Sequence, residues 1–289
     1  MSGSSIAVSR WNSQKRVLKD LLSRTGTLPL AMSSYAGLKR VNPRVALSNL
    51  TVRRQGAPDG LPLPPDRLVH LVAGTSDLDW FLRGGALAAQ CVRQALAAQQ
   101  VADADLGAIL DFGCGCGRVA RHWAGLRPGA LHGVDYNPDL VAWCGANLKF
   151  GQFSVNASLP PLRFNDGTFD LIYAFSVFTH MDGEMQNAWM ADLSRVLKPG
   201  GFLLFSTHGD RYMHHLSPKE REMIETVGMV VKPGGPAGTN LYQAYHSRAY
   251  VENRLCARLE PVSFTPAGAL GNPVQDLHLY RRPRLTGAN

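Results

Sequence analysis

Short runs rich in strand-favouring residues alternate with helical patterns through the middle of the chain. These strand-like runs cover residues 108–112, 131–135, 152–156, 171–175 and 202–207. Between them, apolar residues recur at helical spacing over 118–126, 138–149 and 184–197, and the last pattern runs into the turn-forming residues 198–201. Strands that alternate with helices are typical of a parallel sheet with crossover helices. The pattern therefore predicts a doubly wound α/β fold.

Further elements flank this alternation. Helical patterns at 66–71 and 77–99 precede it, and a helix at 217–227, a loop at 232–239, a helix at 247–257 and hydrophobic runs at 259–264 and 274–281 follow it. The two final runs predict closing strands, so we expect a mostly parallel sheet of seven strands with helices on both faces.

The helix predicted at 77–99 has two unusual features. Its aromatic residues Trp80 and Phe81 belong either to the core or to a lid. Glycine is unfavourable inside a helix, so the pair Gly84 and Gly85 predicts a close approach of the helix backbone to another segment.

The first 65 residues have a different composition, rich in Ser, Arg, Pro and Gly, and they end in GAPDGLPLPPD. Such a proline-rich stretch predicts an irregular, basic arm. Within it, residues 11–22 place apolar side chains on one helical face beside three basic residues. This short helix docks either on the domain or weakly on a membrane surface, and the pattern leaves both open.

Composition limits the classes of protein. The 289 residues are 45% hydrophobic and 18% charged, enough to form the core of one full-sized domain with extra elements. No apolar run approaches the roughly 20 residues of a membrane helix, and the first residues lack the apolar run of a signal peptide, so a cytoplasmic protein is expected. The five cysteines have no disulfide-framework spacing, and the net charge of +8 is a mild excess that argues only weakly for a nucleic acid partner.

A glycine-rich loop follows the first predicted strand. Gly113, Gly115 and Gly117 alternate with cysteines, and such glycines let the backbone turn sharply and lie against a ligand. Asp135 ends the second predicted strand, where a carboxylate can bind both hydroxyls of a ribose. In the dinucleotide fingerprint G-x-G-x-x-G the third glycine comes one residue later, where this chain has Arg118, so the loop suits a ligand without a pyrophosphate.

These motifs resemble those of the class I S-adenosylmethionine (SAM)-dependent methyltransferases, over about residues 107–207. The matching segments are LDFGCGCGRVARH, GVDYNP, NASLPPLRFNDGTFDLIYAFSVFTHM, RVLKPGG and FLLFSTHG. The resemblance implies a Rossmann-like fold, SAM as the cofactor and a methyltransferase domain over 66–289. That domain would comprise a helical lid at 66–100, a core sheet at 107–207 and acceptor-side elements at 208–289, after the arm at 1–65.

The resemblance also implies residue roles. Asp111 corresponds to the acidic residue near the methionine amino group, Asp135 to the ribose ligand and Tyr136 to a residue that lies on the adenine. Asn156 stands where the family often has Asp, before a small residue of the adenine pocket. The expected cofactor-binding residues are Asp111, Gly113, Gly115, Gly117, Arg118, Asp135, Tyr136, Asn156, Ala157 and Phe175.

Three histidines are candidates for a general base. His180 follows the fourth predicted strand, His208 follows the fifth, and His246 precedes the helix at 247–257. A base is needed where the acceptor is a hydroxyl. Each histidine also has a structural interpretation that the sequence leaves open. No metal is required, and Cys114 and Cys116 lack the second ligand pair of a zinc site.

Two missing motifs argue against some acceptors. The chain lacks the Asn/Asp-Pro-Pro-aromatic motif of amino-methylating enzymes and the Pro-Cys nucleophile of cytosine carbon methylation, so no specific nucleic acid is expected. The overall pattern, with the basic arm, the helix before the sheet and the ending QDLHLYRRP, resembles bacterial methyltransferases of small molecules or sugars. The resemblance implies such an acceptor, and the histidines favour a hydroxyl oxygen because a hydroxyl must lose a proton. Three alternative functions remain: N-methylation of a small molecule, protein or RNA; a non-catalytic SAM-binding partner subunit; and an NAD-dependent oxidoreductase. Whether the protein forms homo-oligomers is an open question.

Overall fold

A computed structural model describes residues 43–235, 237–239, 241–271 and 273–284, and the chain divides into two compact units, residues 1–48 and 49–289. The helix predicted at 11–22 lies outside the described residues. The predicted irregular arm is wrong over helix α3 (Pro43–Gln55). Proline is tolerated in the first turn of a helix, so Pro43 begins α3 rather than preventing it. The structure groups residues 49–65 with the second unit.

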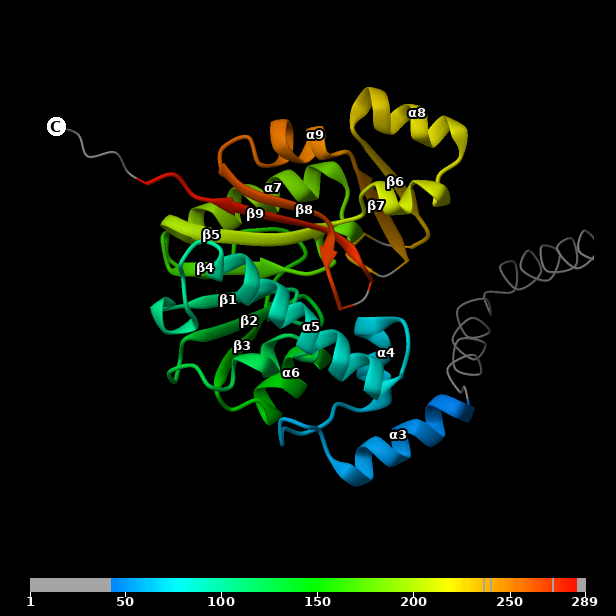
Figure 1. The fold of residues 1–289 in the computed structure, drawn as a ribbon, viewed down its shortest axis with the longest axis vertical. Coiled ribbons are helices and arrows are strands. Elements are labelled where there is room, and N and C mark those ends of the chain that lie inside the picture. The colour runs from blue at the N-terminus through cyan, green and yellow to red at the C-terminus, as the bar shows by residue number, and fades with distance from the viewer. Residues whose placement is uncertain (1–42, 236, 240, 272, 285–289) are drawn as a thin grey trace, which may run out of the picture. The chain divides into compact units, whose positions relative to one another are not determined.

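The second unit is built on the predicted seven-stranded sheet, in the order β3-β2-β1-β4-β5-β9-β8 (Figure 1). Strand β9 is antiparallel to both of its neighbours, and the other pairs are parallel. The strands are β1 (Ile109–Phe112), β2 (Leu131–Asp135), β3 (Gly151–Val155), β4 (Phe169–Ala174), β5 (Leu197–Thr207), β8 (Glu260–Ala269) and β9 (Gln275–Arg281). The predicted doubly wound, Rossmann-like fold is confirmed.

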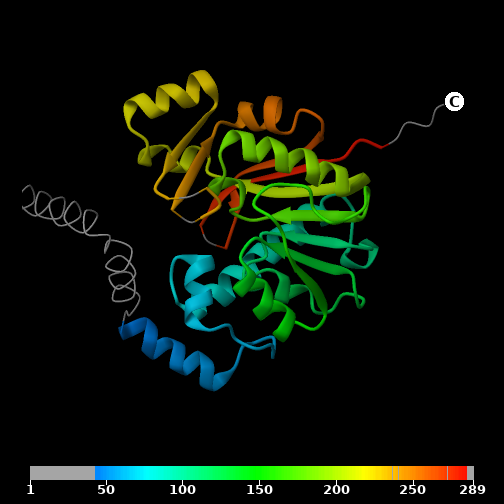
Figure 2. The ribbon, with the colours of Figure 1, turned by 180° about the vertical axis from the view of Figure 1, so that it is seen from behind.

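Helices cover both faces of the sheet (Figures 1 and 2). Alternate residues of β1 divide between the faces: Ile109 packs in one core with helix α5 (Leu78–Ala97), and Leu110 packs in another with helix α7 (Gly183–Val196). Helix α6 (Pro138–Asn147) packs with helix α4 (Asp66–Ala73) through a smaller cluster that contains Leu68 and Leu140. Burial of apolar side chains on both faces explains the continuous hydrophobic character of the central strands.

The helix starts follow from capping side chains. In four helices the N-cap side chain accepts a hydrogen bond from a backbone N–H of the first turn. The capping residues are Asp77 for α5, Asn137 for α6, Asp182 for α7 and Ser217 for α8 (Pro218–Val227). These residue types are favoured at the N-cap because they satisfy donors that the helix itself leaves unpaired.

The structure corrects several predicted elements. The helix expected at 118–126 is only a 3₁₀ turn (Ala120–Trp123), since the segment is short and Gly125 and Pro128 interrupt it. The turn expected at 198–201 lies inside β5, where Gly200 has φ +81°. The helix expected at 247–257 is one short helix, α9 (Arg248–Tyr250), followed by a π-helical turn (Val251–Leu255).

A two-stranded hairpin outside the main sheet was not expected. Strand β6 (Met229–Pro233) overlaps the predicted loop at 232–239 and pairs antiparallel with β7 (Tyr242–His246). With α8, the hairpin forms a small layer beside β5 in Figure 1. Val230 and Tyr245 pack with Ile224 of α8, so the layer has its own small hydrophobic cluster.

The glycine pair in α5 lies at a close backbone contact. A Cβ atom at Gly84 would lie 2.6 Å from the carbonyl oxygen of Gly271, and a Cβ atom at Gly85 would overlap the backbone of Arg118. Phe81 is fully buried and Trp80 is half-buried. The aromatic face of α5 therefore belongs to the core. No helix within the described ranges is long and apolar enough to cross a membrane.

Candidate functional site

The glycine loop lies at the carboxyl end of β1, where the parallel strands of such a sheet present their ligands. Gly113, Gly115 and Gly117 have φ values of +79°, +55° and +77°, which L-residues with a side chain rarely adopt. A Cβ atom at Gly113 would lie 2.5 Å from a methyl group of Val177, and one at Gly115 would lie 2.7 Å from a methyl group of Val72 in α4. The loop is therefore in close contact with the turn after β4 on one side and with α4 on the other.

Asp111 and Tyr173 form an unsatisfied polar pair beneath this loop. They are register partners in β1 and β4, and both side chains are buried. Neither Asp111 Oδ2 nor the Tyr173 hydroxyl has a hydrogen-bond partner among the described residues. Burial raises the pKa of Asp111 to about 7, although Tyr173 and the nearby positive charge of Arg118 oppose the shift. A buried carboxylate oxygen that no hydrogen bond satisfies is costly and is typical of a site built for a ligand.

Asp135 is held in a defined orientation at the end of β2. Its Oδ2 accepts a hydrogen bond from the backbone N–H of Gly115 at 2.9 Å, and its Oδ1 accepts one from the N–H of Asn137 at 2.9 Å. Burial raises the pKa of Asp135, and the two backbone hydrogen bonds oppose this rise. Each carboxylate oxygen keeps a further lone pair, so Asp135 can still accept hydrogen bonds from two ligand hydroxyls. Tyr136, the next residue, is 46% exposed.

The other predicted cofactor residues, Arg118, Asn156, Ala157 and Phe175, make contacts within the protein. Arg118 is buried and donates from Nη1 to the carbonyl oxygen of Gly271 at 2.6 Å. Asn156 donates from Nδ2 to the carbonyl oxygen of Ala157, and the residue Ala157 is exposed. Phe175 packs against Tyr173, with ring centroids 6.2 Å apart. Arg118 and Phe175 thus contact the protein core, whereas Asn156 and Ala157 lie after β3, next to the end of β2.

Two of the predicted histidines bind the same edge of β7. His180 Nδ1 lies 2.7 Å from the carbonyl oxygen of Tyr242, and His208 Nδ1 lies 3.0 Å from that of Ala244. Because a carbonyl oxygen only accepts hydrogen bonds, each Nδ1 must carry a proton and donate it. In the neutral ring this leaves Nε2 unprotonated, and within the described ranges no residue bonds either Nε2. Both rings therefore present a proton acceptor.

His246 differs from these two. Its Nε2 lies 3.0 Å from Oε1 of Gln186, whose Nε2 donates to the carbonyl oxygens of Phe178 and Met181. Those two bonds orient the Gln186 amide, so His246 must donate from Nε2. His246 is only 2% exposed, and its Nδ1 has no partner among the described residues. The structure thus holds His246 in the interior, bonded to Gln186.

Burial favours the neutral form of all three histidines. Burial lowers the pKa of His180, lowers that of His208 to about 4 and lowers that of His246 to about 3. The hydrogen bonds to Tyr242 and Ala244 favour the protonated rings of His180 and His208 but do not outweigh burial. His214 and His215, by contrast, are exposed.

The segment between β6 and β7 links the two sides of this region. Gly238 donates its backbone N–H to the carbonyl oxygen of His180 at 2.6 Å. A Cβ atom at Gly238 would lie 3.9 Å from the ring of Tyr136. The hairpin that the sequence did not predict therefore reaches from the candidate base to the end of β2.

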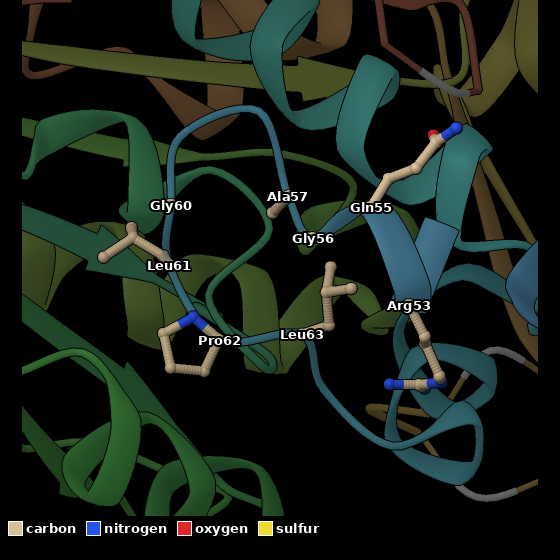
Figure 3. A pocket seen from close by; sticks show the side chains of 8 residues that line it. All are labelled: Arg53, Gln55, Gly56, Ala57, Gly60, Leu61, Pro62 and Leu63. Atoms are coloured by element: carbon tan, nitrogen blue, oxygen red, sulfur yellow. The ribbon is translucent and has the colours of Figure 1, made fainter. Parts of the chain in front are cut away.

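Two surface hollows lie elsewhere. One is lined by Arg53, Gln55 and the loop residues Gly56, Ala57 and Gly60–Leu63, and Figure 3 shows these side chains around it. The other is lined by residues that include Arg93, Asp103 and Trp123. Neither contains a glycine-loop residue, Asp111 or Asp135, so we do not assign the function to them.

The site residues fit SAM as a ligand. The unpaired Oδ2 of Asp111 suits a cationic amino group, and Asp135 suits the two hydroxyls of a ribose. The left-handed glycines provide the backbone approach that the adjoining part of such a ligand needs.

Comparison with known proteins agrees with this assignment. Residues 110–205 match the family described as Methyltransferase domain. Over 128 residues the chain is 30% identical to a sterol 24-C-methyltransferase of Schizosaccharomyces pombe, covering 41% of this chain and 32% of that protein. Over 117 residues it is 30% identical to a fatty-acid O-methyltransferase of Mycolicibacterium smegmatis, covering 38% and 40%. Over 106 residues it is 30% identical to a malonyl-[acyl-carrier protein] O-methyltransferase of Buchnera aphidicola, covering 36% and 41%.

These alignments span less than half the length of each of the three relatives. Among solved structures, the fold is similar to that of a Burkholderia thailandensis 1,6-didemethyltoxoflavin-N1-methyltransferase, at a TM-score of 0.50 and 14% identity, covering 77% of this chain and 92% of that one. That likeness concerns the fold alone. The family match over the glycine loop and the central strands identifies residues 110–205 as a methyltransferase domain, and the site residues fit S-adenosylmethionine as its cofactor.

Proposed function

We propose that the protein transfers the methyl group of SAM to an oxygen atom of a small-molecule or sugar acceptor, with His180 or His208 as the general base. The observation that carries this proposal is the orientation of the two rings. Each donates its Nδ1 proton to β7 and keeps an unprotonated Nε2. His246 we assign a structural role, because both its burial and its bond to Gln186 separate it from an acceptor.

The cofactor-binding roles follow the residue positions. Asp111 would bind the amino group of the methionine part, Asp135 the ribose hydroxyls, and Tyr136 the face of the adenine, with Asn156 and Ala157 at the adenine edge. Bound SAM supplies an already activated methyl group on a sulfonium. The protein must then align the acceptor, exclude water and remove one proton.

The low pKa of the candidate bases is compatible with this role. A hydroxyl oxygen that accepts a methyl group becomes strongly acidic, so a weak base can take its proton late in the reaction. His208, with a pKa of about 4, stays unprotonated and ready to act across the neutral range. Its ring orientation is fixed before the acceptor binds, which favours proton transfer.

The names of two relatives favour an oxygen acceptor, since they describe O-methyltransferases of fatty acids and of malonyl-[acyl-carrier protein]. A carboxylate acceptor is therefore the second candidate. A carboxylate carries no proton at neutral pH, so its methylation needs no base. The two candidates thus differ in whether the histidines matter for turnover.

We also propose roles for the flanking elements. Helix α4 contacts the glycine loop through Val72, which suits a helical lid within residues 66–100. The β6–β7 hairpin contacts His180 and approaches Tyr136, which suits an acceptor-side wall within residues 208–289.

Asparagine substitutions test the base directly. An Asn at 180 or 208 can still donate an amide N–H to the carbonyl on β7, but it has no imidazole Nε2. After an acceptor is found by screening hydroxyl and carboxyl compounds with SAM, His180→Asn and His208→Asn are assayed beside His214→Asn, an exposed control. A hydroxyl acceptor predicts a loss of about 100-fold in kcat for one of the two variants at unchanged SAM affinity. Full turnover of both variants would reject the proposal that His180 or His208 acts as the general base.

A further inference from the structure

We infer that Gln275 and Ser206 are positioning residues that hold the turn Ser176–His180 against the glycine loop. This inference rests on the proposed function, because that turn carries the candidate base and faces the loop that binds SAM. Neither residue is among the predicted cofactor ligands or the candidate bases, although Ser206 stands in the matching segment FLLFSTHG. They act through Ser176.

Ser176 has a backbone conformation that needs support. Its φ is +60°, in the left-handed region that residues with a Cβ atom rarely adopt. It stands directly after β4 and Phe175, at the carboxyl edge of the sheet. Strained backbone of this kind persists only where surrounding contacts over-determine it.

A closed ring of hydrogen bonds provides these contacts. The backbone N–H of Ser176 donates to Ser206 Oγ at 2.8 Å, and the Ser206 hydroxyl donates to Gln275 Oε1 at 2.6 Å. Gln275 Nε2 donates in turn to Ser176 Oγ at 2.9 Å. The ring thus binds both the backbone and the side chain of Ser176 to β5 and β9.

Two members of the ring are buried. Ser206 is 0% exposed and Gln275 is 2% exposed, so the bond between them is shielded from water, whereas Ser176 is half-buried. The Thr179 hydroxyl donates to the carbonyl oxygen of Ser176 at 2.9 Å and lies 3.2 Å from its Oγ. Loss of Gln275 would leave a buried serine hydroxyl without its acceptor and release Ser176 from β9.

The turn held in this way makes the two contacts that matter for the site. Val177 packs on Gly113 of the glycine loop, and His180 donates its Nδ1 proton to Tyr242. A shift at Ser176 therefore moves the residue over the cofactor loop and the candidate base together.

The test compares Gln275→Leu, which removes both side-chain bonds at similar volume, with Thr207→Val. The Thr207 side chain bonds His278 across the same two strands and, among the described residues, makes no hydrogen bond to the turn. Thr207→Val therefore removes a comparable buried polar pair and serves as the matched control. Titration calorimetry with SAM and S-adenosylhomocysteine (SAH) measures binding. The exchange rate of the His180 Nδ1 proton, measured by NMR on the ligand-free protein, reports the turn without any ligand.

We expect Gln275→Leu to weaken SAM binding about tenfold and to speed that proton exchange by a similar factor, while Thr207→Val changes both less than about twofold. Ser206→Ala should reproduce the effect if Gln275→Leu folds poorly. In the Gln275→Leu background, Ser176→Gly should recover affinity, because glycine adopts φ +60° unaided, whereas Ser176→Ala should not.

Unchanged exchange and unchanged SAM affinity in Gln275→Leu, or equal behaviour of the glycine and alanine variants, would overturn the inference. Absence of SAM binding by the unaltered protein would instead reject the proposed function, and the proton exchange would still decide whether Gln275 holds the turn.

Discussion

Asp111 of β1 and Tyr173 of β4 are register partners on neighbouring strands, and each has a buried oxygen without a hydrogen-bond partner among the described residues. The protein folds with this arrangement although it is unfavourable, since the burial that raises the pKa of Asp111 to about 7 also opposes its charge. Unpaired buried oxygens lower the stability of the fold, and such a loss at the end of a central strand is expected where the site binds a ligand.

The first prediction concerns stability. The raised pKa means that the folded protein holds the Asp111 proton more tightly than the unfolded chain, so this group stabilises the fold as pH falls from 7 toward 4 and destabilises it above 7. Asp111→Asn should therefore raise the melting temperature at pH 8 by about 3 °C or more, and much less at pH 5. Differential scanning calorimetry at both pH values measures this. Asp139→Asn, which removes an exposed ion pair with Arg67, is the control and should change little.

The second prediction concerns cofactor binding. If the ionised Asp111 binds the amino group of SAM, affinity should fall roughly fivefold to tenfold from pH 7.5 to pH 6, as the carboxylate is protonated around pH 7. Asp111→Asn should bind SAM weakly at both pH values. A pH-independent affinity of the unaltered protein would remove Asp111 from the amino-group role.

The third prediction concerns the ribose. Asp135→Asn keeps one oxygen that can accept the N–H of Gly115, but its NH2 group can accept neither the N–H of Asn137 nor a ribose hydroxyl. SAM affinity should fall about tenfold to 100-fold, with a melting temperature within about 3 °C of the unaltered protein. Calorimetric titration and a thermal scan check both values, and equal affinity in the variant would argue against the ribose contact.

The fourth prediction concerns His246. Its pKa of about 3 in the fold lies below that of the unfolded chain, so the unfolded state binds a proton first and stability should fall as pH drops below about 6.5. His246→Gln can keep a donor toward Gln186 without titrating, and should flatten that part of the stability curve. Turnover should stay within about threefold, because we assign His246 no proton transfer. A loss of turnover like that expected for the base would show that the assignment of roles is wrong.

Much of the fold could be predicted because its signal is local. The run at 131–135 coincides with β2, and the other strands of the main sheet overlap their predicted runs. The signal is strongest in the central parallel strands, such as β1 and β4, which are buried on both faces and therefore apolar. The 3₁₀ turn at Ala120–Trp123 and the hairpin strand β7 were missed because short segments carry little periodicity.

The candidate site was only partly predictable. The sequence shows the glycines, Asp111, Asp135 and the histidines, but not that carbonyls of β7 orient two of the imidazoles. Gln275 had no signal, because its bond to Ser176 joins residues 99 positions apart. Contacts of this kind depend on the register between distant strands, which one sequence does not display.

Calorimetric titration of the purified protein with SAM, SAH and NAD tests the central claim most directly. We predict saturable binding of SAM and SAH with one site per chain, and no binding of NAD. Binding of neither SAM nor SAH, or binding of NAD in their place, would contradict the account.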